Sequence, residues 1–244
     1  RYVVTQNLSA AGSAIQVNAT GVELEMDGHT ITFGTSSSSV IYGVNLSAQG
    51  ALTVRNGHIV QGAPNGYYTA AIGASSRAFP RNISGVSTGI SGPNTLALKF
   101  LGSATGVELH HNHFASAVTE IQDRHYPGND IVRMDVAAAG NISVHDNLIS
   151  EGAHKALSLG GDAPNIEVSY NDIRHHSRYV NGYAIKVSIP GMHVHHNKLT
   201  SLGRGVHITE SGLDFHDNYL DLKGHWDYDR PQNSEIDWNI IRVE

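Results

Sequence analysis

Apolar and polar residues alternate in one short pattern that occurs five times between Gly106 and Leu220. In each copy, apolar residues at alternate positions precede an Asn, and further apolar residues follow it. This pattern is typical of two short strands that meet at a tight bend. Asn suits the bend because it tolerates the left-handed backbone conformation and because its amide can hydrogen-bond the backbone. The copies are GVELHHNHF (106–114), NISVHDNLI (141–149), NIEVSYNDI (165–173), GMHVHHNKL (191–199) and GLDFHDNYL (212–220).

The fixed asparagines of these copies are Asn112, Asn147, Asn171, Asn197 and Asn218, so successive copies are 35, 24, 26 and 21 residues apart. A repeat at this spacing indicates a solenoid, in which each copy belongs to one coil. Stacked strands lie about 4.8 Å apart. We therefore expect the five side-chain amides to hydrogen-bond in a ladder along the stack.

The first third of the chain carries a looser form of the pattern. GVELEMDGHTITF (21–33) and GVNLSAQGALTVRNGHIV (43–60) place Asp27-Gly28 and Asn56-Gly57 at the corresponding bends. Residues 65–95 are rich in Gly and Ser and give no clear register. We predict one elongated domain over 1–244, with less regular coils in 1–95 and regular coils in 96–244.

A third strand in each coil is predicted by alternation at 43–47, 97–101, 131–136, 156–160, 184–188, 205–209 and, less clearly, 235–239. Side chains at every second position of these strands are apolar and form a stack that faces the core. These inward pairs are Val44/Leu46, Leu98/Phe100, Val132/Met134, Leu157/Leu159, Ile185/Val187, Val206/Ile208 and Ile236/Trp238. The outward residues between them are Asn45, Lys99, Arg133, Ser158, Lys186, His207 and Asp237.

On these motifs the chain resembles the right-handed parallel β-helix proteins of the pectate-lyase-like superfamily. The resemblance implies an all-β fold, a single-stranded right-handed parallel β-helix of about eight or nine coils with an Asn ladder. The chain has no Cys and no apolar stretch long enough to span a membrane. It starts at Arg1 without a signal peptide, so we expect a processed form or an excised domain.

The outward residues suggest a site for an anion. Lys99, Arg133, Lys186 and His207 carry or can carry positive charge, although the formal net charge of the chain is −6. Like charges on adjacent strands repel, so placing Arg133, Lys186 and His207 within about 15 Å, three strand spacings, is costly unless an anion binds there. Asp135 partly offsets this charge. The negative net charge argues against a nucleic-acid partner.

The loops that enter these strands are rich in aromatic and cationic residues and form one wall of a groove beside the outward row. Aromatic rings there would stack on sugars, and Arg and His would bind hydroxyl and carboxylate groups. The resulting candidates for substrate binding are Lys99, Arg124, His125, His154, Lys155, His176, Arg178, Tyr179, Arg204 and Trp226. The predicted partner is a polysaccharide, and we expect an extracellular or periplasmic protein.

The chemistry that this set favours is removal of the C5 proton of a uronic acid, which leads to β-elimination or C5-epimerisation. That step needs cations that neutralise the sugar carboxylate and a base near the proton. The catalytic candidates are Lys186 and His207 as base and acid, Arg133 as a neutraliser, and Tyr126. Hydrolysis is disfavoured because it needs paired carboxylates about 5 to 10 Å apart.

A weaker similarity, to calcium-using polysaccharide lyases and mannuronan C5-epimerases of the same fold, rests on Lys186 in YAIKVS and His207 in RGVHIT. It implies a catalytic Lys and Arg on one strand in successive coils, but here the second residue is His. The sequence also lacks an Asn/Glu/Glu cluster before Lys186 that would hold calcium. We therefore predict no metal and no cofactor.

Two alternatives remain open. His110, His145, His195 and His216 fall in one outward row beside Glu108, Glu167 and Asp214, where imidazoles and carboxylates can share zinc or copper, although no ligand motif of defined spacing is present. The chain can also be a non-catalytic stalk, spike or carbohydrate-binding module. In either case neighbouring domains or chains are expected to cover the open strand edges at its ends.

Overall fold

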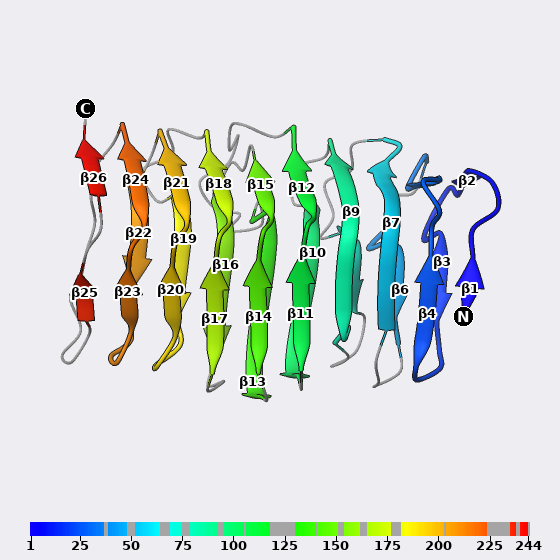
Figure 1. The fold of residues 1–244 in the computed structure, drawn as a ribbon. Coiled ribbons are helices and arrows are strands. Elements are labelled where there is room, and N and C mark those ends of the chain that lie inside the picture. Colours follow the sequence, from blue (N-terminus) through cyan, green and yellow to red (C-terminus); the bar gives the residue numbers. More distant parts are fainter. Residues whose placement is uncertain are drawn as a thin grey trace.

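The protein is a parallel β-helix in which successive coils stack along one axis (Figure 1). The computed structural model describes residues 1–36, 39–47, 52–63, 69–74, 79–91, 95–104, 106–117, 130–139, 141–150, 154–161, 165–176, 182–202, 204–223, 235–237 and 240–243. Within these ranges no helix occurs, so the described part offers no helix that would cross a membrane. The predicted all-β solenoid is confirmed.

The described strands form two sheets. The sheet of eight strands has the order β22-β19-β16-β13-β10-β8-β6-β3, and its pairings are parallel. Its strands are β3 (Ile15–Val17), β6 (Tyr42–Leu46), β8 (Thr69–Ala74), β10 (Thr95–Ala104), β13 (Val132–Ala139), β16 (Lys155–Gly161), β19 (Tyr183–Ser188) and β22 (Arg204–Ile208). Strand β8 gives residues 69–74, which fall in the region whose register the sequence leaves unclear, a defined place in this stack.

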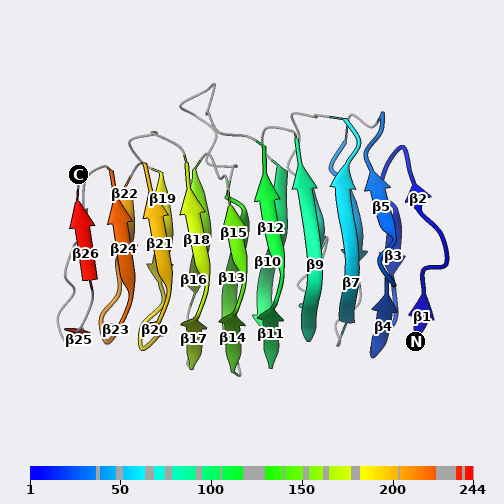
Figure 2. The ribbon, with the colours of Figure 1, turned by 45° about the horizontal axis from the view of Figure 1, so that its top comes forward.

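The sheet of 18 strands contains the strands on both sides of each bend (Figure 2). Strands β7 and β9 run through the bend, and most other coils contribute one strand before it and one after it. These strands are β1 (Tyr2–Val3), β2 (Leu8–Ser9), β4 (Val22–Glu25), β5 (Thr30–Phe33), β7 (Leu52–Gln61), β9 (Asn82–Ile90), β11 (Val107–His110), β12 (His113–Ser116), β14 (Ile142–His145), β15 (Leu148–Ser150), β17 (Ile166–Ser169), β18 (Asp172–His175), β20 (His193–His195), β21 (Lys198–Ser201), β23 (Asp214–His216), β24 (Tyr219–Leu222), β25 (Glu235–Asp237) and β26 (Ile240–Val243).

The left-handed residue of each regular bend is the one before the fixed Asn, not the Asn itself. Positive φ angles of 53° to 57° occur at His111, Asp146, Tyr170, His196 and Asp217. The earlier bends use Asp27 and Asn56, with φ angles of 49° and 56°. The bends occur where predicted, and the amide of each fixed Asn donates to a backbone carbonyl, as expected. The expectation that the Asn itself takes the left-handed conformation is wrong, because the residue before it does so.

The fixed asparagines form the predicted ladder. All five are at most 3% exposed. Each amide nitrogen in the series 112, 147, 171 and 197 donates to Oδ1 of the next Asn at 2.9–3.0 Å. The same Oδ1 atoms also accept from the backbone N–H of the preceding Asn. Buried backbone groups at the bend are thereby satisfied by side chains.

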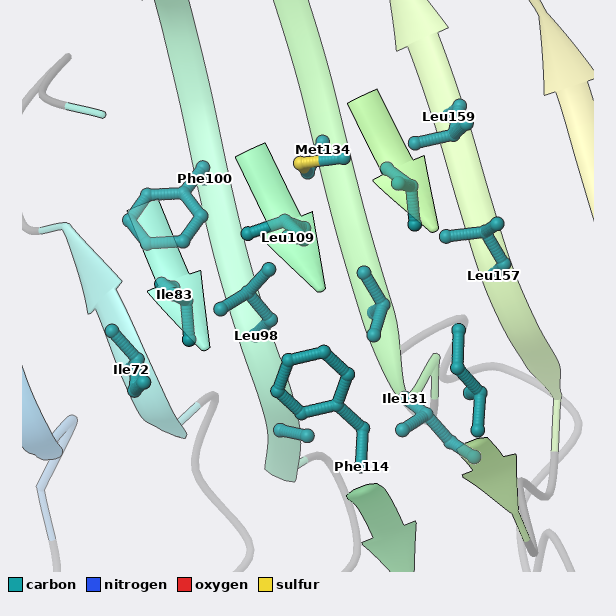
Figure 3. Packing of buried hydrophobic residues seen from close by; sticks show 14 of the residues in the cluster. Ile72, Ile83, Leu98, Phe100, Leu109, Phe114, Ile131, Met134, Leu157 and Leu159 are labelled. Atoms are coloured by element: carbon teal, nitrogen blue, oxygen red, sulfur yellow. The ribbon is translucent and has the colours of Figure 1, made fainter. Parts of the chain in front are cut away.

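The inner faces of the two sheets pack into one core that extends from Val4 to Leu222. Leu98, Phe100, Met134, Leu157 and Leu159 point from the eight-stranded sheet toward Ile83 and Leu109 (Figure 3). Each fully buried aliphatic or aromatic side chain contributes about 1.5–3 kcal/mol. The inward pairs predicted from alternation are confirmed up to Ile208.

One predicted strand lies in the other sheet. Residues Glu235–Asp237 (β25) pair with β23, and Asp237 lies opposite His216. The assignment of Asp237 to the outward row of Lys99 is therefore wrong. Trp238, predicted to face the core beside Ile236, lies outside the described residues.

Candidate functional site

Four cationic or titratable residues form one row on the outer face of the eight-stranded sheet. The register places Lys99 opposite Arg133, Arg133 opposite Ser158, Ser158 opposite Lys186, and Lys186 opposite His207. The residues on either side of each of them in the strand are buried in the core. Because successive side chains of a strand point to opposite faces of the sheet, this row points outward. We call Lys99, Arg133, Lys186 and His207 the basic column.

Arg133 is partly neutralised on its own strand. Its Nε and one terminal nitrogen donate to Asp135 Oδ2 at 3.0 and 2.8 Å. Gly160 lies opposite Asp135, and a Cβ there would lie 2.7 Å from Asp135 Oδ1. Glycine at this position leaves room for the carboxylate. The hydrogen bonds from Arg133 to Asp135 confirm that this carboxylate partly offsets the positive charge.

A buried carboxylate lies at the entry to these strands. Asp130 Oδ1 is 2.7 Å from His154 Nδ1 and 3.5 Å from Lys155 Nζ, and the exposed fractions of the three side chains are 1%, 9% and 12%. The strands hold the three residues together, since the Ile131 N–H donates to the Lys155 carbonyl at 2.9 Å. Asp130 Oδ2 is buried and has no hydrogen-bond partner within the described ranges.

The amine of Lys155 has a lowered pKa. Burial lowers its pKa, and the charges of Lys186 and Arg133 lower it further, while Asp130 acts in the opposite direction. Burial and the charge of Arg133 also lower the pKa of Lys99. A lysine with a lowered pKa has a larger neutral fraction that can accept a proton.

His207 and Tyr183 add an aromatic contact to the same face. Their rings stack with centroids 4.7 Å apart and an interplanar angle of 20°. Tyr183 is 5% exposed and lies in register with Lys155 and Arg204. The ring of Tyr183 thus fixes the orientation of the imidazole at one end of the basic column.

His175 lies beneath the site and is fully buried. Its Nδ1 is 3.1 Å from Ser201 Oγ, and burial lowers its pKa to about 4. A Cβ at Gly182 would lie 2.8 Å from His175 Cε1 and 3.0 Å from the His154 carbonyl oxygen. The neutral ring therefore packs directly against the segment that leads into β19.

The structure brings together some of the predicted site residues and leaves others undescribed. Lys99, Arg133, Lys186 and His207 share the predicted row, and His154 and Lys155 adjoin it through Asp130. His176 follows His175 at the end of β18. Arg124, His125, Tyr126, Arg178, Tyr179 and Trp226, and the side chain of Arg204, lie outside the described part.

Asp130 is not among the predicted site residues, whereas His175 and Tyr183 belong to the loops predicted to form the wall of the groove. Asp130, Lys155 and Tyr183 occupy equivalent positions, because each directly precedes a predicted strand of its coil. This equivalence is the signal in the sequence that points to Asp130. Aligning the residue before each strand, as well as those within it, would have placed a carboxylate, an amine and a phenol in one row.

The predicted row of histidines occurs on the outer face of the 18-stranded sheet. His110 stacks on His145, and His195 stacks on His216, each pair with centroids 5.2 Å apart. Burial lowers the pKa of His110 and of His195. Burial also acts to lower that of His145, but hydrogen bonds with Asp146 and Glu108 hold its pKa above the usual value.

These histidines do not gather in a metal site. Across the described ranges, no group of three or more His, Asp or Glu side chains has an arrangement that would hold a metal ion. His145 Nδ1 lies 2.8 Å from Asp146 Oδ2, and His216 Nδ1 lies 2.8 Å from Asp217 Oδ2. Hydrogen bonds with neighbouring carboxylates thus use ring nitrogens that a zinc or copper ion would need.

Fold and site together define a parallel β-helix protein with an outward basic column and a buried Asp–His–Lys cluster at its edge. Comparisons with protein-family models, with curated proteins and with solved structures find no match to this chain. Its function must therefore be argued from the site.

Proposed function

We propose that this protein binds an anionic, uronate-containing polysaccharide along the basic column and removes the C5 proton of a uronate unit. The observation that supports this proposal is the single outward row of Lys99, Arg133, Lys186 and His207 beside Asp130, His154 and Lys155. The resemblance of the repeats to the right-handed β-helices of the pectate-lyase-like superfamily is consistent with it. A polysaccharide substrate also favours an extracellular or periplasmic location.

Each group has a role that its position supports. Lys99 and Arg133 neutralise the sugar carboxylate, which makes the adjacent C–H more acidic. Lys155 or Lys186 accepts the C5 proton, and the lowered pKa of Lys155 favours it for that task. His207, oriented by Tyr183, donates a proton to the leaving oxygen.

Two outcomes follow from the same carbanion-like intermediate. In β-elimination the C4–O bond breaks, a C4–C5 double bond forms, and the departing glycosidic oxygen takes a proton. In epimerisation C5 receives a proton on the opposite face and no bond of the chain is broken. The choice between them depends on whether the acid reaches the leaving oxygen or the ring carbon.

The test uses the full chain with polygalacturonate, alginate and hyaluronan. Elimination is followed by ultraviolet absorbance of the unsaturated uronate, and epimerisation by deuterium uptake at C5 in heavy water. Lys155→Met and Lys186→Met identify the base, because the substitution that removes it should lower the rate on the responsive polymer by about 100-fold or more. Lys198→Met is the matched control, because Lys198 is exposed on β21 in the other sheet.

Absence of both product and deuterium uptake on all polymers would refute the proposed chemistry. Binding to a polymer without turnover, weakened by substitutions in the basic column, would instead assign a carbohydrate-binding module. Binding that these substitutions leave unchanged would show that the basic column is not the polymer site.

A further inference from the structure

Two adjoining hollows lie on the outer face of the 18-stranded sheet, which does not carry the basic column. The first has a volume of about 550 Å³, and its lining includes Thr53, Arg55, Arg81, Asn82, Glu108 and Ser143. The second has a volume of about 480 Å³, and its lining includes Ser143, Glu167 and His193. Because they share Asn141 and Ser143, we treat them as one furrow.

The furrow follows the stacking direction of the coils. Strand register aligns in one row Thr53, Asn82, Glu108, Ser143, Glu167 and His193, from β7, β9, β11, β14, β17 and β20. Five strand spacings correspond to roughly 24 Å. The monosaccharide repeat of an extended glycan is close to one strand spacing, so such a chain would meet a comparable polar side chain in each coil.

Two guanidinium groups line one end of the furrow. Arg55 is paired with Glu23 at 3.4 Å, but both side chains are at least one-third exposed, and such pairs are weak. Within the described ranges no carboxylate pairs with Arg81, which is also exposed. A guanidinium group binds carboxylate and sulfate oxygens through parallel hydrogen bonds, and each of these two arginines can do so.

The side-chain oxygen of Asn82 is a hydrogen-bond acceptor without a donor among the described residues. Its Oδ1 is buried and, among the residues that the structure describes, has no hydrogen-bond partner. Its amide nitrogen donates to Glu108 Oε2 at 2.9 Å and lies 3.1 Å from His110 Nε2. A buried acceptor left unsatisfied is destabilising, and a ligand hydroxyl would satisfy it once the Asn82 side chain turned toward the furrow.

Glu108 is suited to binding a ligand rather than to donating a proton. Burial acts to raise the pKa of Glu108, but hydrogen bonds from His145 and Asn82 outweigh it and hold the pKa below its usual range. An ionised Glu108 accepts hydrogen bonds from sugar hydroxyls but does not serve as the proton donor that glycoside hydrolysis requires.

We propose that the furrow is a non-catalytic binding site for a linear oligosaccharide that bears a carboxylate or sulfate group. The acidic group lies between Arg55 and Arg81, and sugar hydroxyls bond Asn82, Glu108 and Ser143 in the following coils. The furrow is separate from the basic column, so this inference does not rest on the chemistry proposed for that column.

Calorimetric titration of the full chain tests the inference with three short probes: oligogalacturonate for carboxylate, a sulfated glycosaminoglycan oligosaccharide for sulfate, and a cello-oligosaccharide as the neutral chain. In a chain that also carries Lys99→Ala and Lys186→Ala to remove binding at the basic column, Arg55→Ala with Arg81→Ala should weaken binding of an acidic probe by at least tenfold, in line with loss of two charge-assisted contacts. Ser143→Trp, which fills the shared part of the furrow, should weaken it as well.

Arg174→Ala is the matched control, since Arg174 is an exposed arginine paired with Asp172 on β18, beyond the bend. A combined Lys99→Ala and Lys186→Ala variant tells the two surfaces apart, because it should spare binding in the furrow. Equal affinity of that variant with and without the two Arg substitutions would overturn the inference. So would equal affinity for acidic and neutral chains, or no binding of either acidic probe.

Discussion

His154 Nδ1 lies 2.7 Å from Asp130 Oδ1, and the same oxygen lies 3.5 Å from Lys155 Nζ. One carboxylate on one coil thus contacts two consecutive residues of the next coil. Because Asp130 is only 1% exposed, solvent screens these contacts weakly. The protonation of Lys155 therefore depends on its burial and on the charges of Asp130, Lys186 and Arg133.

The first prediction concerns Asp130→Asn. The carboxylate of Asp130 raises the pKa of Lys155, so its removal should lower that pKa further and increase the neutral fraction of the amine. The measurement is the pH dependence of Lys155 labelling by an amine-reactive reagent, read by peptide mass spectrometry. An unchanged labelling midpoint would contradict the assigned contact.

Lys186→Met should shift the same midpoint in the opposite direction. The positive charge of Lys186 lowers the pKa of Lys155, and the uncharged methionine removes this repulsion at similar side-chain length. The labelling midpoint of Lys155 should therefore move to higher pH. Two variants that move it in the same direction would show that general changes in exposure, not charge, control the amine.

His175 makes the stability of the fold depend on pH. Its pKa is about 4 in the folded protein against 6.5 for an ordinary histidine, so between these values the unfolded chain binds the proton and the folded chain does not. The free energy of unfolding should fall as pH decreases from 6.5 toward 4, by on the order of 3 kcal/mol in total. Above pH 6.5 the histidine is neutral in both states, and this loss of unfolding free energy is absent.

Denaturant unfolding at pH ~7 and pH ~4 measures this loss. His175→Gln should show a smaller difference between the two conditions than the wild type, because its side chain does not titrate there. His113→Gln controls for substitution of a histidine at an exposed position. An identical pH dependence in the wild type and His175→Gln would exclude His175 as the cause.

Much of the fold follows from the sequence because strand periodicity is a strong signal. Alternation alone places Leu98 and Phe100 inside and Lys99 outside, and the register between neighbouring strands then aligns Lys99 with Arg133. Alternation does not tell which sheet a strand joins, which is why Glu235–Asp237 was assigned to the wrong sheet. It also gives no information on Asp130, whose role depends on contacts made just before a strand begins.

Gly57 lies at the bend of β7, where the structure leaves no room for a side chain. A Cβ at Gly57 would collide with Met26 Cβ and lie 2.8 Å from the His29 carbonyl oxygen. Gly57→Ala should therefore destabilise the protein by about 1–3 kcal/mol, as overpacking of a core does. Gly12→Ala is the control, because nothing lies within 4 Å of the added atom. Thermal unfolding of both variants checks the difference, and equal midpoints would contradict it.

The last prediction concerns the middle of the ladder. Asn171 donates to the Val144 carbonyl at 2.8 Å and to Asn197 Oδ1 at 2.9 Å, and its Oδ1 accepts from the backbone and the side chain of Asn147 at 3.0 Å. Asn171→Ala leaves these buried groups without partners, and each orphaned group costs about 1–3 kcal/mol.

Because some of these groups can recruit water or shift, the expected loss of unfolding free energy for Asn171→Ala is about 2–5 kcal/mol. Asn141→Ala is the matched control, since Asn141 is exposed and has no place in the ladder. Urea unfolding measures both variants, and hydrogen exchange at the amides of Asn147 and Asn171 locates the effect. If Asn171→Ala were no less stable than Asn141→Ala, stacked amides would not be what holds the bends of this β-helix together.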